Sequence, residues 1–421
     1  MNDSKINGLK SSPTFIFTLL FLLYMFDYLD RMVIVSLFPF LKSDWGITDT
    51  QCGLLVSAVY WSILIFTLPV SVLIDRWSRK KSIGLMATLW GLAALACAFT
   101  KGFGQLFAAR TAVGLGEAGY APGGTAMISA IYPKEKRARI LGVWNASIPL
   151  GSALGVVLGG VIAQHFGWRH AFGIVALPGL VVAILFFYIK DYKTVALTRA
   201  VDVGDPKTKA KMDWRDITLH FVGNKTLIFN NLAFAANTFV TTSLLTWLPS
   251  YFQRTQDISM SRAATKGGIV MLLAIIGAPL GGYLTDMWLK KRANARLLLP
   301  AISSLVTGSA LFIAFTFFSG QTQYLLLLAA GISAVAFVPG SVAVTQDVVH
   351  PGLRAISISL CVVVQHLLGS ALGPPSIGAL SDAFGLQTAM TFLPLFCLLA
   401  MALFFIGSFF YVSDLQKIEK P

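Results

Sequence analysis

The chain has 421 residues, of which 56% are hydrophobic and 12% are charged, and its formal net charge is +14. Soluble globular proteins carry about 25% charged residues, so this composition, with a mean hydropathy of +0.72, excludes that class and indicates a membrane protein. The positive charge is spread over short loops, which argues against nucleic-acid binding. Four isolated cysteines without ligand spacing predict neither a metal site nor a disulfide framework.

Apolar stretches of about 20 residues recur along the whole chain, and each is long enough to cross roughly 30 Å of hydrocarbon as an α-helix. The strands of a membrane barrel are only about 10 residues long. The sequence therefore predicts an all-α membrane protein. In chain order the twelve expected spans are 13–41, 51–73, 82–100, 104–132, 140–166, 171–189, 226–251, 267–287, 297–318, 324–348, 356–380 and 388–412.

Basic residues predict the orientation of these spans. Of the 33 lysines and arginines, 25 lie in the terminal segments and in the loops after even-numbered spans, whereas six lie in the loops after odd-numbered spans. Basic loops stay on the cytoplasmic side. We therefore expect a multi-pass protein of the cell membrane (the inner membrane in a bacterium) with both termini cytoplasmic. Lys134 and Lys209 should lie inside, and Lys101 and Arg254 outside.

An internal repeat divides the chain into two halves. The hexapeptide Leu-Gly-Ser-Ala-Leu-Gly occurs at 150–155 and again at 368–373, an offset of 218 residues. A second similarity, offset by 211 residues, relates positions 71–80 to 282–291. We expect six-helix bundles at 1–189 and 226–421, joined by a polar cytoplasmic linker at 190–225. Parallel repeats of this kind place a substrate site between the halves, near the middle of the bilayer.

Short motifs within this frame resemble a known family. Residues 75–80, Asp-Arg-Trp-Ser-Arg-Lys, are similar to the loop signature of the major facilitator superfamily. Within that superfamily the chain most resembles spinster-like transporters, through Tyr-Leu-Asp-Arg at 28–31, Arg110 followed by Gly-Glu-Ala at 116–118, and His-Leu-Leu-Gly at 366–369 before Pro-Pro at 374–375. The first two features are also similar to the anion:cation symporters, and Ser370 stands where spinster proteins usually have aspartate. The resemblance implies the major facilitator fold, with twelve transmembrane helices in two six-helix halves.

Five ionisable residues fall inside the predicted spans of the N-terminal half. Such groups cost several kcal/mol in hydrocarbon unless they face protein or water, so each is a candidate functional residue. Arg110 and Glu117 are seven residues apart, which places them on one helix face about 10 Å from each other. We expect Asp30 and Glu117 to carry a coupling proton. Arg31 and Arg110 are expected to bind substrate, assisted by Asp27, which lies one helical turn before Arg31. The structural alternative is an ion-pair cluster that only joins the helices.

Polar residues elsewhere complete the predicted sites. Tyr120 follows Glu117 by three residues on the same helix face, but a tyrosine packed between helices is an equal alternative. His366 either contacts substrate or donates one structural hydrogen bond. Asn237 and Gln365 are further expected substrate contacts. A cytoplasmic gate, for which helix capping is the alternative, is expected at Asp75, Arg76, Arg79 and Asp286.

These features predict a secondary transporter that works by alternating access and is coupled to protons. The sequence has no Gly-rich phosphate-binding loop ending in Lys-Ser or Lys-Thr, so neither an ATP-driven pump nor a cofactor is expected. An enzymatic role is not expected either, because no nucleophile lies beside an acid-base pair. A receptor that kept the fold without transporting is a further alternative, which the retained acidic residues disfavour.

The predicted substrate is an amphiphilic anion. Guanidinium groups suit carboxylates and phosphates, whereas the second half offers an apolar wall in Phe234, Phe239 and Trp247. Spinster-like proteins carry lysophospholipids and phosphorylated sphingoid bases, and the resemblance implies such a substrate. A small organic anion such as a sugar acid is the runner-up. The expected partners are this small-molecule or lipid substrate, protons and membrane lipids, with no nucleic acid, and the protein is expected to be a monomer.

Overall fold

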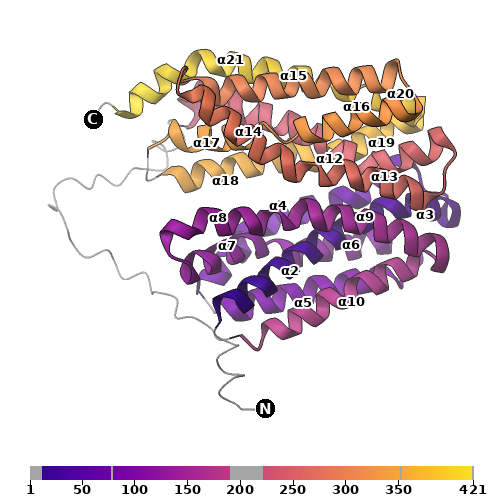
Figure 1. Ribbon diagram of the computed structural model, residues 1–421. Helices are drawn as coiled ribbons and strands as arrows, with labels where there is room; N and C mark the ends of the chain where they lie inside the picture. The colour runs from indigo at the N-terminus through magenta and orange to yellow at the C-terminus, as the bar shows by residue number, and fades with distance from the viewer. Residues whose placement is uncertain (1–11, 77–78, 190–220, 351–352, 420–421) are drawn as a thin grey trace.

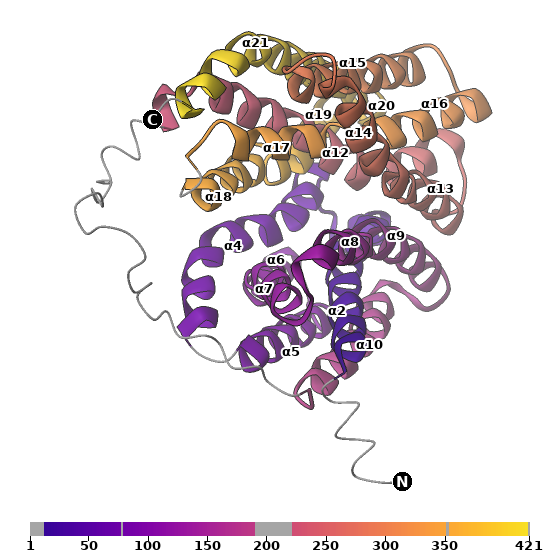
Figure 2. The same ribbon diagram turned by 60° about the vertical axis from the view of Figure 1, so that its left-hand side comes forward.

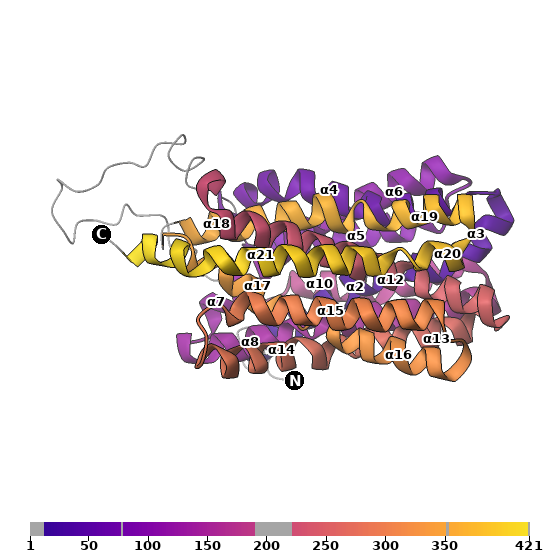
Figure 3. The same ribbon diagram turned by 90° about the horizontal axis from the view of Figure 1, so that it is seen from above.

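The computed structural model describes residues 12–76, 79–189, 221–350 and 353–419. Every regular element in these ranges is a helix, and Figure 3 shows the helices lying along one common direction. This architecture follows from the apolar sequence, because a backbone in hydrocarbon must satisfy its hydrogen bonds within its own segment. Most of the predicted linker lies outside the described residues, and its boundaries stay a prediction.

The described part of the N-terminal half forms six helical rods, several of them made of consecutive helices. They appear as the lower group in Figure 1. In chain order they are α2 (Pro13–Val33) continued by η1 (Ile34–Leu37) and α3 (Phe38–Trp45), α4 (Asp49–Arg76), α5 (Arg79–Cys97), α6 (Phe103–Glu117) with α7 (Tyr120–Ile131), α8 (Lys134–Asn145) with α9 (Ser147–Phe166), and α10 (Trp168–Phe186).

The C-terminal half repeats this pattern over its described residues and forms the upper group in Figure 1. Its rods are α12 (Lys225–Gln256), α13 (Met260–Leu272) with α14 (Ala274–Leu289), α15 (Ala295–Thr316), α16 (Gly320–Ser333) with α17 (Val338–Asp347), α18 (Arg354–Gln365) joined through the π-helical η4 (His366–Ser370) to α19 (Gly373–Phe384), and α20 (Leu386–Met390) with α21 (Leu393–Glu419).

These twelve rods match the predicted spans in order. Among the described residues, eight helical stretches are long and apolar enough to cross a membrane by themselves. The other four rods are α2 to α3, α5, α6 to α7, and α12, and they lie in the same bundle (Figure 1). Three of those four carry buried charged or amide side chains, which lowers their hydropathy. Because buried polar groups in membrane helices are candidate functional residues, these three rods are expected to carry the site.

The repeated hexapeptide makes the same kind of helix crossing in both halves. In the first half it lies on α9 and crosses α2, where a Cβ atom on Gly151 would approach the carbonyl oxygen of Met25 to 2.2 Å. In the second half it spans η4 and the start of α19 and crosses α12, where a Cβ atom on Gly369 would approach the carbonyl oxygen of Ala235 to 2.8 Å. Only glycine allows backbones to pack this closely, so the repeat preserves the contact between the first and fifth rods of each half.

Candidate functional site

The five ionisable residues predicted within the N-terminal spans gather in one buried cluster, which we call the charge cluster. They come from α2 and α6, and none is more than 5% exposed. Its members are Asp27, Asp30, Arg31, Arg110 and Glu117.

Arg31 is the hub of the charge cluster. Its Nη2 atom donates to Oε2 of Glu117 over 2.6 Å and to Oδ2 of Asp27 over 3.2 Å. The second contact is the pairing across one helical turn that the sequence predicted. The other carboxylate oxygens of Asp27 and Glu117, and Nε of Arg31, are buried without a hydrogen-bond partner among the described residues. Two carboxylates thus share one guanidinium group, and hydrogen-bonding capacity is left over.

Aromatic rings connect Arg31 to the other half of the protein. Its guanidinium carbon lies 4.5 Å from the ring centroid of Tyr28 and 5.4 Å from that of Tyr60. Tyr60 in turn stacks on the ring of His366, with centroids 5.7 Å apart and an interplanar angle of 26°. Cation–π contacts of this kind are favourable in a desolvated site. The stack therefore joins the charge cluster to the π-helical segment η4 of the C-terminal half.

Arg110 has a different environment. It donates to the backbone carbonyl oxygens of Leu55, Asp30 and Arg31 over 3.3, 3.1 and 2.9 Å, and it is 1% exposed. These bonds tie α6 to α2 and α4. In this structure the guanidinium group therefore holds backbone in place, and its predicted contact with substrate stays a prediction.

Asp30 is held by a residue that the sequence analysis did not single out. The indole Nε1 of Trp90 on α5 donates to Oδ2 of Asp30 over 2.8 Å. Gly116 allows the approach of the two helices, since a Cβ atom there would lie 2.6 Å from the backbone nitrogen of Trp90. The sequence signal was a tryptophan inside an apolar span, where its N–H needs an acceptor.

The formal charge of the cluster is not balanced. Three carboxylates and two guanidinium groups leave one excess negative charge when all five are ionised. An uncompensated charge in the middle of a membrane protein is costly. Uptake of one proton removes the excess, so the composition of the charge cluster suits a site that binds and releases a proton.

Two predicted substrate contacts lie at interfaces within one half. The hydroxyl group of Tyr120 donates to the carbonyl oxygen of Leu20 over 2.6 Å, and the side chain is 1% exposed. Nδ2 of Asn237 donates to the hydroxyl oxygen of Ser304 over 2.8 Å, and Asn237 is also buried. In the state described here both residues join helices. For Tyr120 this position is the alternative given in the sequence analysis, a tyrosine packed between helices.

Gln365 and His366 lie where α18 passes into the π-helical turn η4. Both are partly buried, and Nδ1 of His366 has no hydrogen-bond partner among the described residues. π-Helical turns occur frequently at functional sites. This turn places the histidine ring on Tyr60 and leaves its nitrogen available, so the predicted contact with substrate is compatible with its position.

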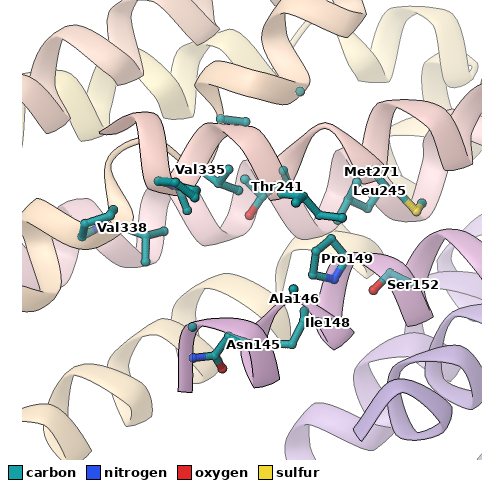
Figure 4. Close-up of a pocket in the computed structure, with 18 of the residues that line it drawn as sticks. Asn145, Ala146, Ile148, Pro149, Ser152, Thr241, Leu245, Met271, Val335 and Val338 are labelled. Atoms are coloured by element: carbon teal, nitrogen blue, oxygen red, sulfur yellow. The ribbon is translucent and has the colours of Figure 1, made fainter. Parts of the chain in front are cut away.

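A cavity of about 970 Å³ lies between the two halves. It is bounded by α8 and α9 on one side and by α12, α13, α14, α16 and α17 on the other, and Figure 4 shows side chains of both halves pointing toward it. Its walls are mainly apolar, with Leu244, Leu245, Val270, Met271 and Val335 among them.

The aromatic residues predicted to form an apolar wall lie outside the lining of this cavity, and their contact with substrate stays a prediction. Phe234, Phe239 and Trp247 do not line the cavity. Phe239 stacks on Phe396 with ring centroids 4.0 Å apart, and Phe234 packs edge-on against Phe337 within the C-terminal half. Trp247 packs on Phe38 of the opposite half, with ring centroids 5.3 Å apart.

A network of ion pairs closes the halves at the end of the bundle that holds α3 and the start of α4. The Asp49 carboxylate receives two bonds from Arg254, of 2.6 and 2.8 Å, one of 2.5 Å from Lys42 and one of 2.5 Å from Ser381. The Asp49 side chain is only 3% exposed. Because Arg254 and Ser381 belong to the C-terminal half, this buried carboxylate binds the two halves together.

Asp382 adds a second link at the same end. Its carboxylate accepts hydrogen bonds from the backbone N–H groups of Asp49 and Thr50, both 2.8 Å, and from the Thr50 hydroxyl over 2.6 Å. An acidic side chain at the start of a helix satisfies its free N–H groups. Here the cap of α4 comes from the opposite half. We call the two sets of contacts, centred on Asp49 and Asp382, the closed-end lattice.

The predicted gate lies at the opposite end of the helices. The side chains of Asp75, Arg76 and Arg79, where α4 ends and α5 begins, lie outside the described residues. Asp286, near the end of α14, is described and exposed. The gate thus stays a prediction, although the closed-end lattice shows that the two halves are joined at the other end.

Comparison with known proteins gives a consistent picture. The sequence profile of the Major Facilitator Superfamily matches residues 20–370. The chain is 30% identical over 377 residues to the hexuronate transporter of Bacillus subtilis (strain 168), covering 87% of each protein. It is 26% identical over 427 residues to a sphingosine-1-phosphate transporter of Xenopus tropicalis, covering 94% of this chain and 81% of that one.

A solved structure confirms the predicted fold. A bacterial homologue of the human lysosomal transporter spinster, in an inward-facing and unoccupied conformation, superposes with a TM-score of 0.83 at 22% identity. The match covers 96% of this chain and 98% of that one. The predicted resemblance to spinster-like proteins and the all-α membrane fold in two six-helix halves are both confirmed.

Proposed function

Because the chain belongs to the Major Facilitator Superfamily and is a membrane transporter rather than an enzyme, we propose that it is a secondary transporter working by alternating access. We propose further that it carries an amphiphilic anion of the lysophospholipid or sphingolipid type and is coupled to protons.

The observation that carries the substrate proposal is the apolar lining of the cavity between the halves. Of its described wall residues, only Arg139, Asn145, Ser152 and Thr241 offer a polar side chain. A sugar acid has hydroxyl groups all round, and each would lose its hydrogen bonds to water without replacement, at about 1–3 kcal/mol apiece. A hydrocarbon chain loses nothing on entering such walls. The cavity therefore suits a substrate with a long apolar part.

A small organic anion is the second candidate. It is favoured by the similarity to the hexuronate transporter of Bacillus subtilis, which at 30% identity exceeds the similarity to the sphingosine-1-phosphate transporter. Both candidates carry an anionic group, so both need a cation in the site.

Within the charge cluster, whose members do not line the cavity in the state described here, Arg31 is the cation better placed for this anion. Its Nε is unpartnered among the described residues, and it is connected through Tyr60 to the opposite half. Arg110, by contrast, is held by three backbone carbonyls. Protonation of Glu117 or Asp27 removes the negative charge of that carboxylate and weakens its hydrogen bond with Arg31. The guanidinium group is then free to bind a carboxylate or phosphate. Proton and anion then favour each other's binding, and this reciprocity is the basis of coupling. Asp30, held by Trp90, is the second proposed proton carrier.

The state described here faces inward if the orientation predicted by the basic residues holds. The closed-end lattice then lies on the outer side, and the Arg139 end of the cavity lies on the cytoplasmic side. Alternating access requires this lattice to open while the opposite ends of the helices come together. Those ends carry the residues of the predicted gate: Asp75, Arg76, Arg79 and Asp286.

Orientation is tested by labelling single cysteines in intact cells with a membrane-impermeant maleimide. Cysteines at Lys101 and Arg262, both exposed, are expected to react, whereas a cysteine at the exposed Lys136 reacts only after permeabilisation. Arg262 replaces Arg254 as the outer site because Arg254 is engaged with Asp49. Labelling of the Lys136 position in intact cells would reverse the orientation.

The substrate proposal is tested by binding to the purified protein in detergent or nanodiscs. A lysophospholipid should bind more tightly than gluconate, and its affinity, expressed per free aqueous monomer, should rise with chain length, since each CH₂ removed from water contributes about 0.8 kcal/mol. Arg31→Ala should remove the preference for an anionic headgroup, and Arg31→Lys should recover it only in part because the planar fork is lost. Tighter binding of sugar acids, without an effect of chain length, would support the second candidate instead.

A further inference from the structure

The two carboxyl groups bound to Arg31 each keep one oxygen atom without a partner. These atoms are Oδ1 of Asp27 and Oε1 of Glu117, and both are buried without a hydrogen-bond partner among the described residues. The side chains of Asp27 and Glu117 are only 2% and 0% exposed, so bulk water does not reach them. An ionised carboxylate can only accept hydrogen bonds, whereas a protonated one can also donate. One proton therefore supplies the donor that this pair of acceptors lacks.

The same two carboxyl groups meet at a single atom although they come from different helices. Nη2 of Arg31 donates to Oε2 of Glu117 over 2.6 Å and to Oδ2 of Asp27 over 3.2 Å. Asp27 lies on α2, and Glu117 is the last residue of α6. The two side chains are close enough to form a hydrogen bond with each other when one is protonated. Two carboxyl groups at such a separation in a buried site share one proton, because their like charges repel.

The excess negative charge of the charge cluster belongs to this pair. Asp30 is held separately, because its Oδ2 atom accepts a hydrogen bond from an indole on α5 over 2.8 Å and the charge of Arg110 acts on it. Asp30 and Arg110 therefore balance each other. Asp27 and Glu117 then share Arg31, which sets two negative charges against one positive charge. A single proton on the pair balances the charge of Arg31.

The other titratable groups near the pair do not take the place of this proton. The titratable and charged groups that face the pair or its arginine are Tyr24, Tyr28, Asp30 and Arg31 on α2, Tyr60 on α4, Arg110 on α6, Tyr120 on α7 and His366 on η4. The tyrosines are uncharged near neutral pH, and Tyr120 donates to the carbonyl oxygen of Leu20. None of the described side chains donates to the two free oxygen atoms. The proton is thus left to the pair itself.

We propose that Asp27 and Glu117 hold the coupling proton jointly, between Oδ1 of the first and Oε1 of the second. Asp27 is then a coupling residue and not only a support for Arg31. This inference rests on the proposed function and specifies where its proton is bound. With the proton present, one oxygen carries the O–H bond and the other accepts a hydrogen bond from it. When the proton leaves for water, the second negative charge returns and competes with a bound anion for Arg31.

The shared proton is tested by infrared difference spectra of the purified protein in nanodiscs, recorded between mildly acidic and mildly alkaline pH. The C=O band of a buried protonated carboxyl group should disappear from the wild-type spectrum as the pH rises. Glu117→Gln and Asp27→Asn should each remove the same part of this band, because each leaves one carboxylate balanced by Arg31. The double variant should remove no more than either single variant, since the two residues share one proton.

Two results would overturn the shared proton. Losses that add up in the double variant would show two separate protons, and a full band in Asp27→Asn would leave Glu117 as the sole carrier. Asp27→Glu, which keeps a carboxyl group at this position, should retain the band, so that a loss in Asp27→Asn is not a folding defect. Asp257→Asn removes an exposed carboxylate beyond the end of α12 and, as the matched control, should leave the band unchanged.

A transport measurement separates this inference from the function on which it rests. In lipid vesicles, Asp27→Asn should abolish the accumulation of oleoyl lysophosphatidate that an imposed proton gradient drives, although the Oδ1 atom of asparagine can still accept a hydrogen bond from Arg31. Undiminished accumulation would reduce Asp27 to a support for Arg31 and contradict the inference. The infrared test needs no substrate. Wild-type protein that shows the shared band but accumulates neither lysophosphatidate nor a hexuronate would contradict the proposed function alone.

Discussion

Glu117→Gln is expected to abolish substrate accumulation driven by a proton gradient while leaving substrate binding in place. Glu117 accepts a 2.6 Å hydrogen bond from Arg31, and its other carboxylate oxygen is buried without a partner among the described residues. Glutamine keeps the shape of the protonated acid but carries no exchangeable coupling proton. Wild-type affinity for an anionic substrate should rise about tenfold as the pH falls, and the variant should show the low-pH affinity at every pH.

The matched control is Asp257→Asn. Asp257 is exposed beyond the end of α12, with a φ of 48° that asparagine also adopts readily. The substitution removes a carboxylate that lies outside the charge cluster, so coupled uptake should be unchanged.

Asp30→Asn should also lose coupled uptake, because it removes the second proposed proton carrier, the carboxylate that accepts a hydrogen bond from Trp90. Undiminished proton-driven uptake in both Glu117→Gln and Asp30→Asn would contradict proton coupling through the charge cluster.

Asp49→Asn is expected to release the closed end of the protein. The substitution removes the charge that Arg254 and Lys42 share, and both of those cations are about one-third exposed and can turn to water. The loss should be on the order of 2 kcal/mol, which shifts the balance between the two states about thirtyfold toward the one open at this end. Spin labels at Lys101 and Arg262, which lie at this end in opposite halves, should report a longer distance.

Asp44→Asn provides the control for the closed-end lattice. Asp44 also accepts a hydrogen bond from Trp168 and pairs with Arg169, but both partners belong to its own half. Its loss should leave the distance between the labels unchanged. A distance that changes equally in the two variants would show that the closed-end lattice does not hold the halves together.

The positions of the spans followed from the sequence with small errors at their ends. The span expected at 297–318 is α15, Ala295–Thr316, and the one expected at 226–251 lies within α12, Lys225–Gln256. α12 extends beyond its expected span because α-helices continue past the hydrocarbon layer into the surface layers, where apolar composition no longer marks them, whereas α15 is shifted by two residues toward the N-terminus. The repeated hexapeptide was equally reliable, since its glycines form the same crossing twice.

The candidate site was predicted as a set of residues but not as a set of contacts. Spacing along one helix correctly paired Asp27 with Arg31. It gave no information on Trp90, which holds Asp30, or on the three backbone carbonyls that hold Arg110. It also gave no information on the ring partners of Phe234, Phe239 and Trp247, because the face that a ring presents within its bundle depends on the neighbouring helices.

Composition and order along the chain were enough to establish the membrane environment, the two halves and the buried charges. The free energy of placing an apolar or charged side chain in hydrocarbon depends on that residue and its near neighbours in sequence. The partners of those charges were decided only by tertiary packing. Arg31 and Glu117 are 86 residues apart, and Arg254 and Asp49 are 205 residues apart. A hydrogen bond requires its two groups to meet within about 3 Å, and over such separations only the packing of the rods against one another brings them together.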